Sequence, residues 1–134
     1  MDDCIFCKIV KGSSPSYKIY ENQYAYAFLD ISGDIDGHTL VIPKEHYVNV
    51  LDCDEQALAE VMKVVQKVAR HYVDKCGYDG VNILNANNAG AQQSVFHLHF
   101  HIIPRKKDDG EDAFPRLSGA KHELKEMCEK LKIN

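Results

Sequence analysis

The 134-residue sequence contains no apolar run that approaches the roughly 20 residues of a membrane-spanning helix. Its first residues carry neither the positive charge nor the apolar stretch of a secretory signal peptide. It has no excess of positive charge either, because 20 acidic residues outnumber 16 lysines and arginines and give a formal net charge of −4. Such a chain has no overall attraction for nucleic acid or anionic lipid. We therefore expect a soluble cytoplasmic protein whose partners are neither membranes nor nucleic acids.

Internal repeats, low-complexity segments and a disulfide framework are also missing from the sequence. The five cysteines are an odd number, which argues against a set of paired disulfides in an intracellular chain. Cys4 and Cys7 are the one closely spaced pair, and coincidence, redox chemistry and zinc binding are all open explanations for it. A redox role for this pair is typical of a thioredoxin-like β-α-β setting, which the surrounding sequence pattern lacks.

The composition is typical of one globular domain over residues 1–134, with 45% apolar and 27% charged residues. Residues 54–76 predict the strongest helix, because apolar side chains recur there at three- and four-residue steps: Leu58, Val61, Met62, Val65, Val68, Ala69 and Tyr72. Residues 120–131 predict a second amphipathic helix that packs on the domain, and residues 4–11 predict a short first helix.

The remaining regular segments predict five strands, at residues 18–20, 24–29, 38–42, 81–84 and 95–103. Their order along the chain favours an α+β domain with two main helices, in which the helices lie on one face of a mainly antiparallel five-stranded sheet. A parallel doubly wound sheet is excluded, because helices are missing between successive strands.

The most informative segment is 95–103, in which histidine alternates with apolar residues. In a strand, His97, His99 and His101 share one face and line a surface groove, while the intervening apolar side chains enter the core. Imidazole can bind a metal, shuttle protons or attack an electrophile, and the neutral ring is well suited to attack phosphorus. The preceding loop, residues 85–94, is rich in amide and hydroxyl groups that can bind phosphate oxygens as neutral donors.

Further motifs accompany the histidines over residues 4–105: CIFCKI at 4–9, FLDI at 28–31, HTLVIPKEH at 38–46 and QSVFHLHFHII at 93–103. This combination resembles the histidine triad (HIT) family of nucleotide hydrolases and transferases, in particular its branch of small zinc-containing nucleoside phosphoramidate hydrolases. The resemblance implies a HIT-like fold with a core over about 4–105, followed by a C-terminal loop and helix over 106–134. It also implies a homodimer whose sheets join across the interface.

The resemblance implies a catalytic role for four histidines. His99 attacks the α-phosphorus and forms a nucleotidyl-histidine intermediate, and His101 contacts the phosphate and stabilises the charge that develops on it. His97 supports both through its backbone carbonyl, and His38 lies close by as a further polar support.

The resemblance also implies a set of substrate contacts. Asp30 holds the ribose hydroxyls through two hydrogen bonds, while Gln93 and Ser94 contact the phosphate or the leaving group. The base lies among apolar side chains, which are Ile5, Phe6, Ile9, Phe28, Leu29 and Leu40. For Leu40, simple core packing is an equally good explanation.

Two positions depart from the family pattern. Close relatives have a side-chain amide eleven residues before the first triad histidine, where this chain has Ala86. We expect one of the flanking residues, Asn85 or Asn87, to contact the phosphate instead. A C-terminal tryptophan that contacts the leaving group in some relatives is excluded, because the chain has no tryptophan.

The Cys-x-x-Cys pair gains a specific interpretation from the resemblance. Members of this branch complete the site with two distant histidines, and the matching positions here are His46 and His97. Zinc bound by Cys4, Cys7, His46 and His97 has a closed tetrahedral shell and is therefore structural. Such an ion ties the N-terminal segment to the sheet and orients the histidine strand.

Together these implications predict a nucleotidyl hydrolase that cleaves purine nucleoside phosphoramidates, of the AMP or GMP type, or related adenylylated compounds. Nucleotidyl transfer and cleavage of dinucleoside polyphosphates are alternatives that the same histidine strand can serve. Two other readings stay open: a nucleotide-binding regulatory module with incidental turnover, and a catalytic metal site formed by all three histidines.

Overall fold

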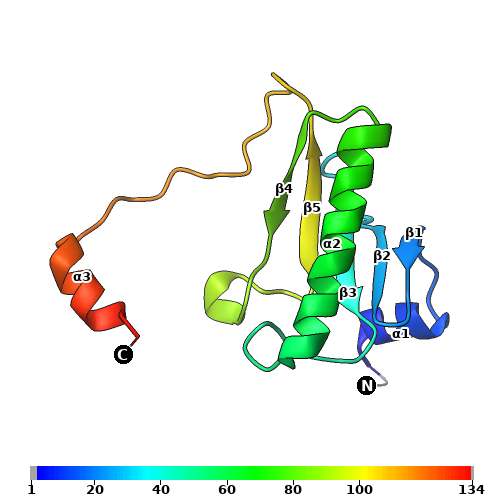
Figure 1. Ribbon diagram of the computed structural model, residues 1–134, viewed down its shortest axis with the longest axis horizontal. Helices are drawn as coiled ribbons and strands as arrows, with labels where there is room; N and C mark the ends of the chain where they lie inside the picture. Colours follow the sequence, from blue (N-terminus) through cyan, green and yellow to red (C-terminus); the bar gives the residue numbers. More distant parts are fainter. Residues whose placement is uncertain (1–2, 134) are drawn as a thin grey trace.

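The centre of the molecule is a five-stranded antiparallel sheet, seen in the computed structural model, which describes residues 3–133 (Figure 1). Its strands follow the spatial order β1-β2-β3-β5-β4. Their bounds are β1 Lys18–Glu21, β2 Ala25–Leu29, β3 Thr39–Pro43, β4 Gly80–Leu84 and β5 Phe100–Arg105. The predicted α+β class and five-stranded sheet are confirmed, while residues 1, 2 and 134 of the predicted domain lie outside the described part.

Helix α2, Glu55–Lys75, covers one face of this sheet. It begins as predicted, because the Asp54 carboxylate accepts a hydrogen bond from the backbone N–H of Ala57 at 3.1 Å. The buried stripe of the helix and the sheet residues below it form one apolar core: Val61, Val64, Val65, Val68, Tyr72, Ala25, Ala27, Val41, Leu98, Phe100 and Ile102. Neither α2 nor any other helix within residues 3–133 is long and apolar enough to cross a membrane.

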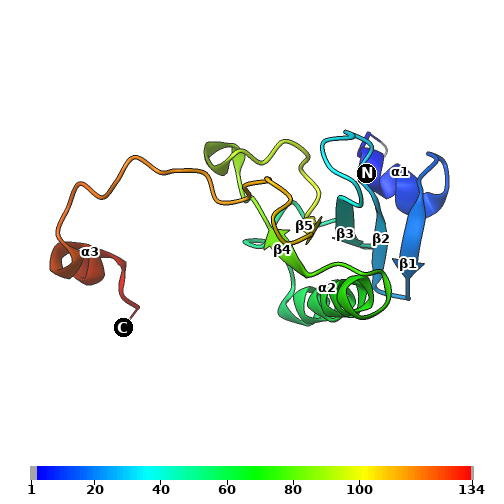
Figure 2. The same ribbon diagram turned by 90° about the horizontal axis from the view of Figure 1, so that it is seen from above.

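Helix α1, Ile5–Lys11, lies on the opposite face of the sheet (Figure 2). Phe6 and Ile9 pack there against the alternate residues of β2 and β3, which are Tyr26, Phe28, Leu40 and Ile42. The prediction that the helices share one face is therefore wrong. The physical reason is that β2 and β3 carry apolar side chains on both faces, so each face requires a cover.

The strand predicted over 95–103 begins later in the structure, since β5 starts at Phe100. The N–H of Leu98 donates to the carbonyl of Tyr47 at 2.7 Å, whereas the residues from Phe100 onward pair with β3 and β4. The predicted alternation persists through this irregular stretch, because Leu98, Phe100 and Ile102 all enter the core under α2. The histidines face the side that carries α1, where His97 is fully buried and not open in a surface groove.

After β5 the chain leaves the sheet as an extended arm that ends in helix α3, Leu124–Leu131 (Figure 1). Leu124 is 85% and Leu131 67% exposed, and no residue of α3 is buried. The prediction that this helix packs on the domain is therefore wrong for the described chain. An amphipathic pattern indicates that the apolar face of the helix packs against another surface, but it does not show whether that surface belongs to the same chain.

Candidate active site

The middle histidine of the segment, His99, has one ring nitrogen bound to the backbone. Its Nδ1 lies 2.8 Å from the carbonyl oxygen of His97, and because a carbonyl oxygen only accepts, Nδ1 carries the hydrogen. The Nε2 atom of the neutral ring therefore holds a free electron pair. Burial lowers the pKa of His99 below its ordinary value, which favours the neutral form. The backbone thus holds this imidazole in a nucleophilic tautomer.

His99 lies in the wall of a cavity of about 470 Å³ beside α1 and β2. A volume of this order is typical of sites for small molecules. Ten residues expected at the nucleotide site line the cavity: Ile5, Phe6, Ile9, Phe28, Leu29, Asp30, Leu40, Ser94, His99 and His101. The sequence did not indicate the five other lining residues, which are Ser14, Pro15, Ser16, Ile31 and Val95.

Phe6 of α1 packs directly on the imidazole of His99. The two ring centroids are 5.3 Å apart with their planes at 85°, an edge-to-face arrangement. Phe6 makes a second edge contact with Phe28, at 5.5 Å and 74°. Because such pairs have a preferred geometry, they fix the orientation of the His99 ring. Helix α1 is therefore a wall of the site as well as a cover for the sheet.

His101 belongs to a chain of hydrogen bonds that leads to two carboxylates. Its Nδ1 lies 2.8 Å from Nε2 of His38, and Nδ1 of His38 lies 2.8 Å from Oδ1 of Asp34. The Oδ2 atom of Asp30 is 3.3 Å from that same His38 nitrogen. Burial, together with the neighbouring imidazoles, lowers the pKa of His101 to about 4, so the ring is neutral near pH 7. A phosphate in the cavity would favour its protonation, because an anion stabilises the charged form.

The structure places Asn85 and Asn87 behind the histidines and outside the lining of the cavity. The side-chain N–H of Asn85 donates to the carbonyl of His99 at 2.9 Å. The side chain of Asn87 donates to Oδ1 of Asn85 at 2.5 Å and accepts from the N–H of Val50 at 2.8 Å. Both amides are therefore in contacts that support the backbone of His99.

Gln93 is also buried behind the cavity, whereas its neighbour Ser94 lines it. The Gln93 side chain donates to the carbonyls of Val48 and Val95 at 2.6 and 3.0 Å, and it accepts from the side-chain N–H of Asn49 at 3.1 Å. These bonds tie the segment after β3 to the segment before β5. Gln93 therefore holds Ser94 in place from behind.

A second group of side chains, behind His99, has the composition of a metal site. The ligand atoms of Cys4, Cys7, His46 and His97 all lie within 4.8 Å of one another. Nδ1 of His97 is 3.4 Å from Sγ of Cys4, and Nδ1 of His46 is 3.3 Å from Sγ of Cys7. Tetrahedral zinc, with bonds of about 2.3 Å to sulfur and 2.0 Å to nitrogen, separates such ligands by about 3.5 Å. The four residues therefore fit zinc in both donor type and spacing.

The tautomer of His97 agrees with this fit. Its Nε2 donates to the carbonyl of Pro43 at 2.9 Å, which leaves the electron pair of Nδ1 directed at the cysteines. Within residues 3–133, the other group of potential ligands is Asp30, His38 and His101, and His99 belongs to neither group. This division argues against a catalytic metal held by all three histidines of the strand.

Two supporting residues, Asp34 and Asn49, were missed by sequence reasoning. A carboxylate four residues before a histidine, between Gly33 and Gly37, was an available signal for Asp34. The sequence offered no such signal for Asn49. Its side chain is only 3% exposed because distant segments pack around it, and a sequence does not show that packing.

The fold and the site define a small α+β protein in which alternating histidines face an apolar cavity. The family model of the HIT domain matches residues 11–108, so the chain belongs to the HIT family, as its motifs predicted.

The relatives include proteins of assigned activity. A HIT-like protein of Borreliella burgdorferi is 51% identical over 112 residues, which cover 82% of this chain and 81% of the relative. The adenosine 5'-monophosphoramidase HNT1 of Saccharomyces cerevisiae is 40% identical over 105 residues, which cover 78% of this chain and 64% of the yeast protein. Among solved structures, a zinc-bound histidine triad family protein from Mycobacterium smegmatis has a TM-score of 0.79 at 38% identity, over 84% of this chain and 81% of that chain.

Proposed function

We propose that this protein is a nucleotidyl hydrolase that cleaves purine nucleoside phosphoramidates or related adenylylated compounds through a covalent intermediate on His99. The observation that carries the proposal is the tautomer of His99, whose Nδ1–H donates to the carbonyl of His97 at 2.8 Å. This bond leaves Nε2 as the nucleophilic atom in a cavity of nucleotide size. The 40% identity to a yeast adenosine 5'-monophosphoramidase supports the substrate class.

The proposed reaction has two displacements at phosphorus. Nε2 of His99 forms a bond to the α-phosphorus, and the bond from phosphorus to the leaving nitrogen breaks as that nitrogen takes up a proton. Water then attacks the same phosphorus, gives up a proton and releases the nucleoside monophosphate from His99. His101, held by His38, contacts the phosphoryl oxygens and stabilises the charge that develops on them.

The remaining contacts follow the lining of the cavity. Asp30 binds the ribose hydroxyls as an acceptor, and Ser94 donates to the phosphate. The purine lies between the apolar side chains of α1 and those of β2 and β3, which are Ile5, Phe6, Ile9, Phe28, Leu29 and Leu40. Apolar contacts of this kind would distinguish little between purines, so we expect both AMP-type and GMP-type substrates to be accepted.

We also propose that Cys4, Cys7, His46 and His97 hold a structural zinc ion. With two thiolates and two imidazoles as ligands, the ion would cross-link α1 to the segments that carry His46 and His97. Because His97 also supports His99 through its carbonyl, this cross-link would steady the nucleophile.

The proposed assembly is a cytoplasmic homodimer. Strand β4 pairs with β5 on one side only, and Ile83 and Leu84 are 44% and 36% exposed. An edge of this kind can pair with another strand, as in a sheet that continues into a second copy. The thiols of Cys53, Cys76 and Cys128 are free, which suits a reducing compartment.

The test is rapid quenching of the protein with adenosine 5'-phosphoramidate, followed by mass spectrometry of its peptides. We expect a nucleotide adduct on His99, no adduct and no turnover in His99→Ala, and normal turnover in the control His122→Ala, whose ring is exposed in the arm. Undiminished hydrolysis by His99→Ala contradicts the proposal. Parallel kinetics with an adenylylated sulfate and a dinucleoside polyphosphate separate the other hydrolase activities, and micromolar nucleotide binding without turnover would indicate a regulatory module.

A further inference from the structure

Asp34 lies in the loop between β2 and β3, and it binds a histidine that the cavity itself does not contact. The loop is closed by the N–H of Asp30, which donates to the carbonyl of His38 at 2.8 Å. This closure brings Oδ1 of Asp34 to 2.8 Å from Nδ1 of His38. Within residues 3–133, His38 is the single ion-pair partner of Asp34.

Two carboxylates compete for the one N–H of His38. Asp34 lies 2.8 Å from Nδ1 of His38, and Oδ2 of Asp30 lies 3.3 Å from the same atom. A neutral imidazole has a single hydrogen on nitrogen, so one good hydrogen bond uses it up. The shorter contact goes to Asp34, and Oδ2 of Asp30 is left without a short bond at the edge of the cavity.

The same contact fixes the tautomer of both rings. A carboxylate only accepts, so Nδ1 of His38 carries the hydrogen and its Nε2 is an acceptor. His101 must then donate from Nδ1 to Nε2 of His38, across 2.8 Å. The other nitrogen of His101, Nε2, is thereby left for the substrate or for a proton.

We propose that Asp34 is a positioning residue that fixes the tautomers of His38 and His101 and, by occupying the N–H of His38, keeps Asp30 free for the ribose of the substrate. The second part rests on the proposed function, in which Asp30 binds the ribose hydroxyls. Without Asp34, the nearest carboxylate to His38 is Asp30, which needs to move only a few tenths of an ångström, from 3.3 Å, to replace it. An Asp30 bound to His38 has fewer lone pairs for the sugar, and substrate binding weakens.

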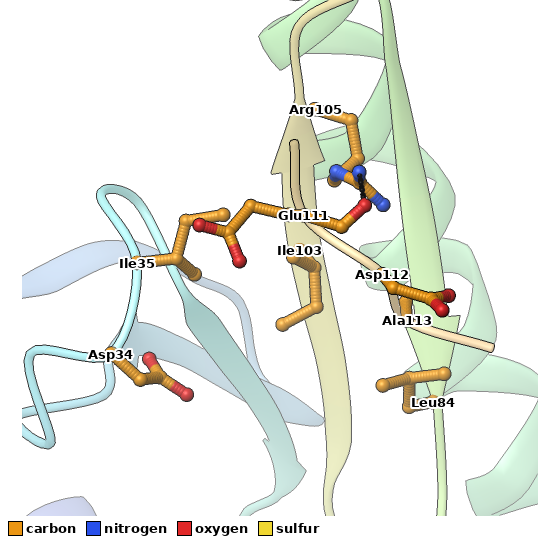
Figure 3. Close-up of a pocket in the computed structure, with 8 residues that line it drawn as sticks. All are labelled: Asp34, Ile35, Leu84, Ile103, Arg105, Glu111, Asp112 and Ala113. Atoms are coloured by element: carbon orange, nitrogen blue, oxygen red, sulfur yellow. Dashed lines mark hydrogen bonds between the residues drawn. The ribbon is translucent and has the colours of Figure 1, made fainter. Parts of the chain in front are cut away.

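The surroundings of Asp34 make this inference testable without unfolding the protein. Its side chain is 56% exposed. Figure 3 shows the carboxylate at the rim of a second cavity, of about 210 Å³, with Ile103 and Leu84 on its far side. Arg105, which also lines this cavity, is bound to Asp109 and Asn82. Removal of the Asp34 carboxylate therefore leaves no buried partner unpaired except His38.

The experiment compares Asp34→Ala and Asp34→Asn with Asp36→Ala, a matched loss of one negative charge in the same loop. Each protein is assayed with adenosine 5'-phosphoramidate and with its 2',3'-dideoxy analogue, and kcat and KM are measured for both substrates. In the wild type and Asp36→Ala, loss of the hydroxyls should lower kcat/KM by about tenfold or more, the value of a charge-assisted hydrogen bond. In Asp34→Ala the ribose substrate should have a higher KM, and the effect of removing its hydroxyls should shrink to less than about threefold.

Asp34→Asn provides the rescue. Its amide oxygen can accept from Nδ1 of His38 without a charge, so the ribose effect should return to near the wild-type value. Long-range proton–nitrogen NMR spectra of the imidazoles add a readout independent of activity. Hydrogen at Nδ1 of His38 should dominate in the wild type, in Asp30→Ala, where Asp34 alone holds it, and in Asp34→Ala, where Asp30 replaces Asp34. The two tautomers should mix in Asp30→Ala/Asp34→Ala, which has neither carboxylate.

An unchanged ribose effect in Asp34→Ala overturns the inference, and so does a single His38 tautomer in Asp30→Ala/Asp34→Ala. Failure of the proposed function has a different signature, because the wild type itself would then show no turnover or no dependence on the ribose hydroxyls. In that case the NMR comparison still decides whether Asp34 fixes the two rings.

Discussion

The side-chain amide of Asn85 holds the backbone of His99, donating to its carbonyl oxygen across 2.9 Å. A residue just after β4 thus holds in place the backbone that carries the nucleophile, immediately before β5. We predict that Asn85→Ala lowers kcat by about tenfold, the value of one buried hydrogen bond, with little change in KM. Steady-state kinetics measure this, with Asn22→Ala as the control, because the Asn22 amide caps the distant turn between β1 and β2. A rise in KM alone would show that Asn85 contacts the substrate instead.

Replacement of His101 should act on turnover more than on binding. We predict that His101→Ala lowers kcat by about 100-fold or more, because a lost donor to a developing oxyanion has an effect of this order. KM should stay within about threefold of the wild-type value, since the ground-state phosphate has other partners. The control is His71→Ala, on the exposed side of α2. Equal losses in kcat and in affinity would contradict the proposed role.

The folded protein should lose stability as the pH falls from about 6.5 towards 4, partly through His101. Burial holds the pKa of this ring at about 4 in the folded state, below its ordinary value of 6.5. The unfolded chain therefore binds the proton first, so the stabilisation is complete above about 6.5, declines between the two values and levels off below 4.

The measurement is urea unfolding of the wild type and of His101→Asn at pH 7.5 and at pH 4.5. We expect the wild type to lose about 1–2 kcal/mol more than the variant between these values, after allowance for solvent around the partly exposed ring. This double difference removes the titration of groups that do not contact His101. Equal losses in the two proteins would show that His101 titrates normally.

The cysteine pair should bind one zinc ion per chain. We predict that Cys7→Ser abolishes this stoichiometry, measured by elemental analysis, and lowers Tm by roughly 10 °C or more, since the metal links α1 to the sheet. Cys53→Ser, outside the cluster, should retain zinc and thermal stability. Full zinc content and an unchanged Tm in Cys7→Ser would contradict the proposed structural zinc site.

Much of the fold followed from periodicity in the sequence. The apolar stripe of residues 54–76 predicted α2 and its buried face, and the alternation of residues 97–102 predicted which side chains enter the core. Periodicity does not show how many faces of a sheet are covered, so the position of α1 was missed. It also does not show whether an amphipathic helix finds its partner in the same chain, which is why α3 was placed wrongly.

The candidate site was predictable where motifs carry the chemistry and unpredictable where distant loops meet. His99, His101, Asp30 and Ser94, which the motifs singled out, line one cavity. The orientation of Asn85 and Gln93, by contrast, depends on hydrogen bonds to carbonyls of His99 and Val48 that only the folded backbone brings near. A loop sequence shows which groups are available but not the direction in which they point.

His97 uses both ring nitrogens and its carbonyl oxygen at once: Nδ1 faces the cysteines, Nε2 binds the carbonyl of Pro43, and the carbonyl oxygen accepts from His99. No other amino acid supplies two ring nitrogens in this geometry. A saturation mutagenesis scan should therefore find this position intolerant of every replacement, and the phenotype of any one of them will merge three separate defects. For this reason, the three roles are separated by substitutions at its hydrogen-bonded partners Cys4 and His99, each of which meets His97 at one atom.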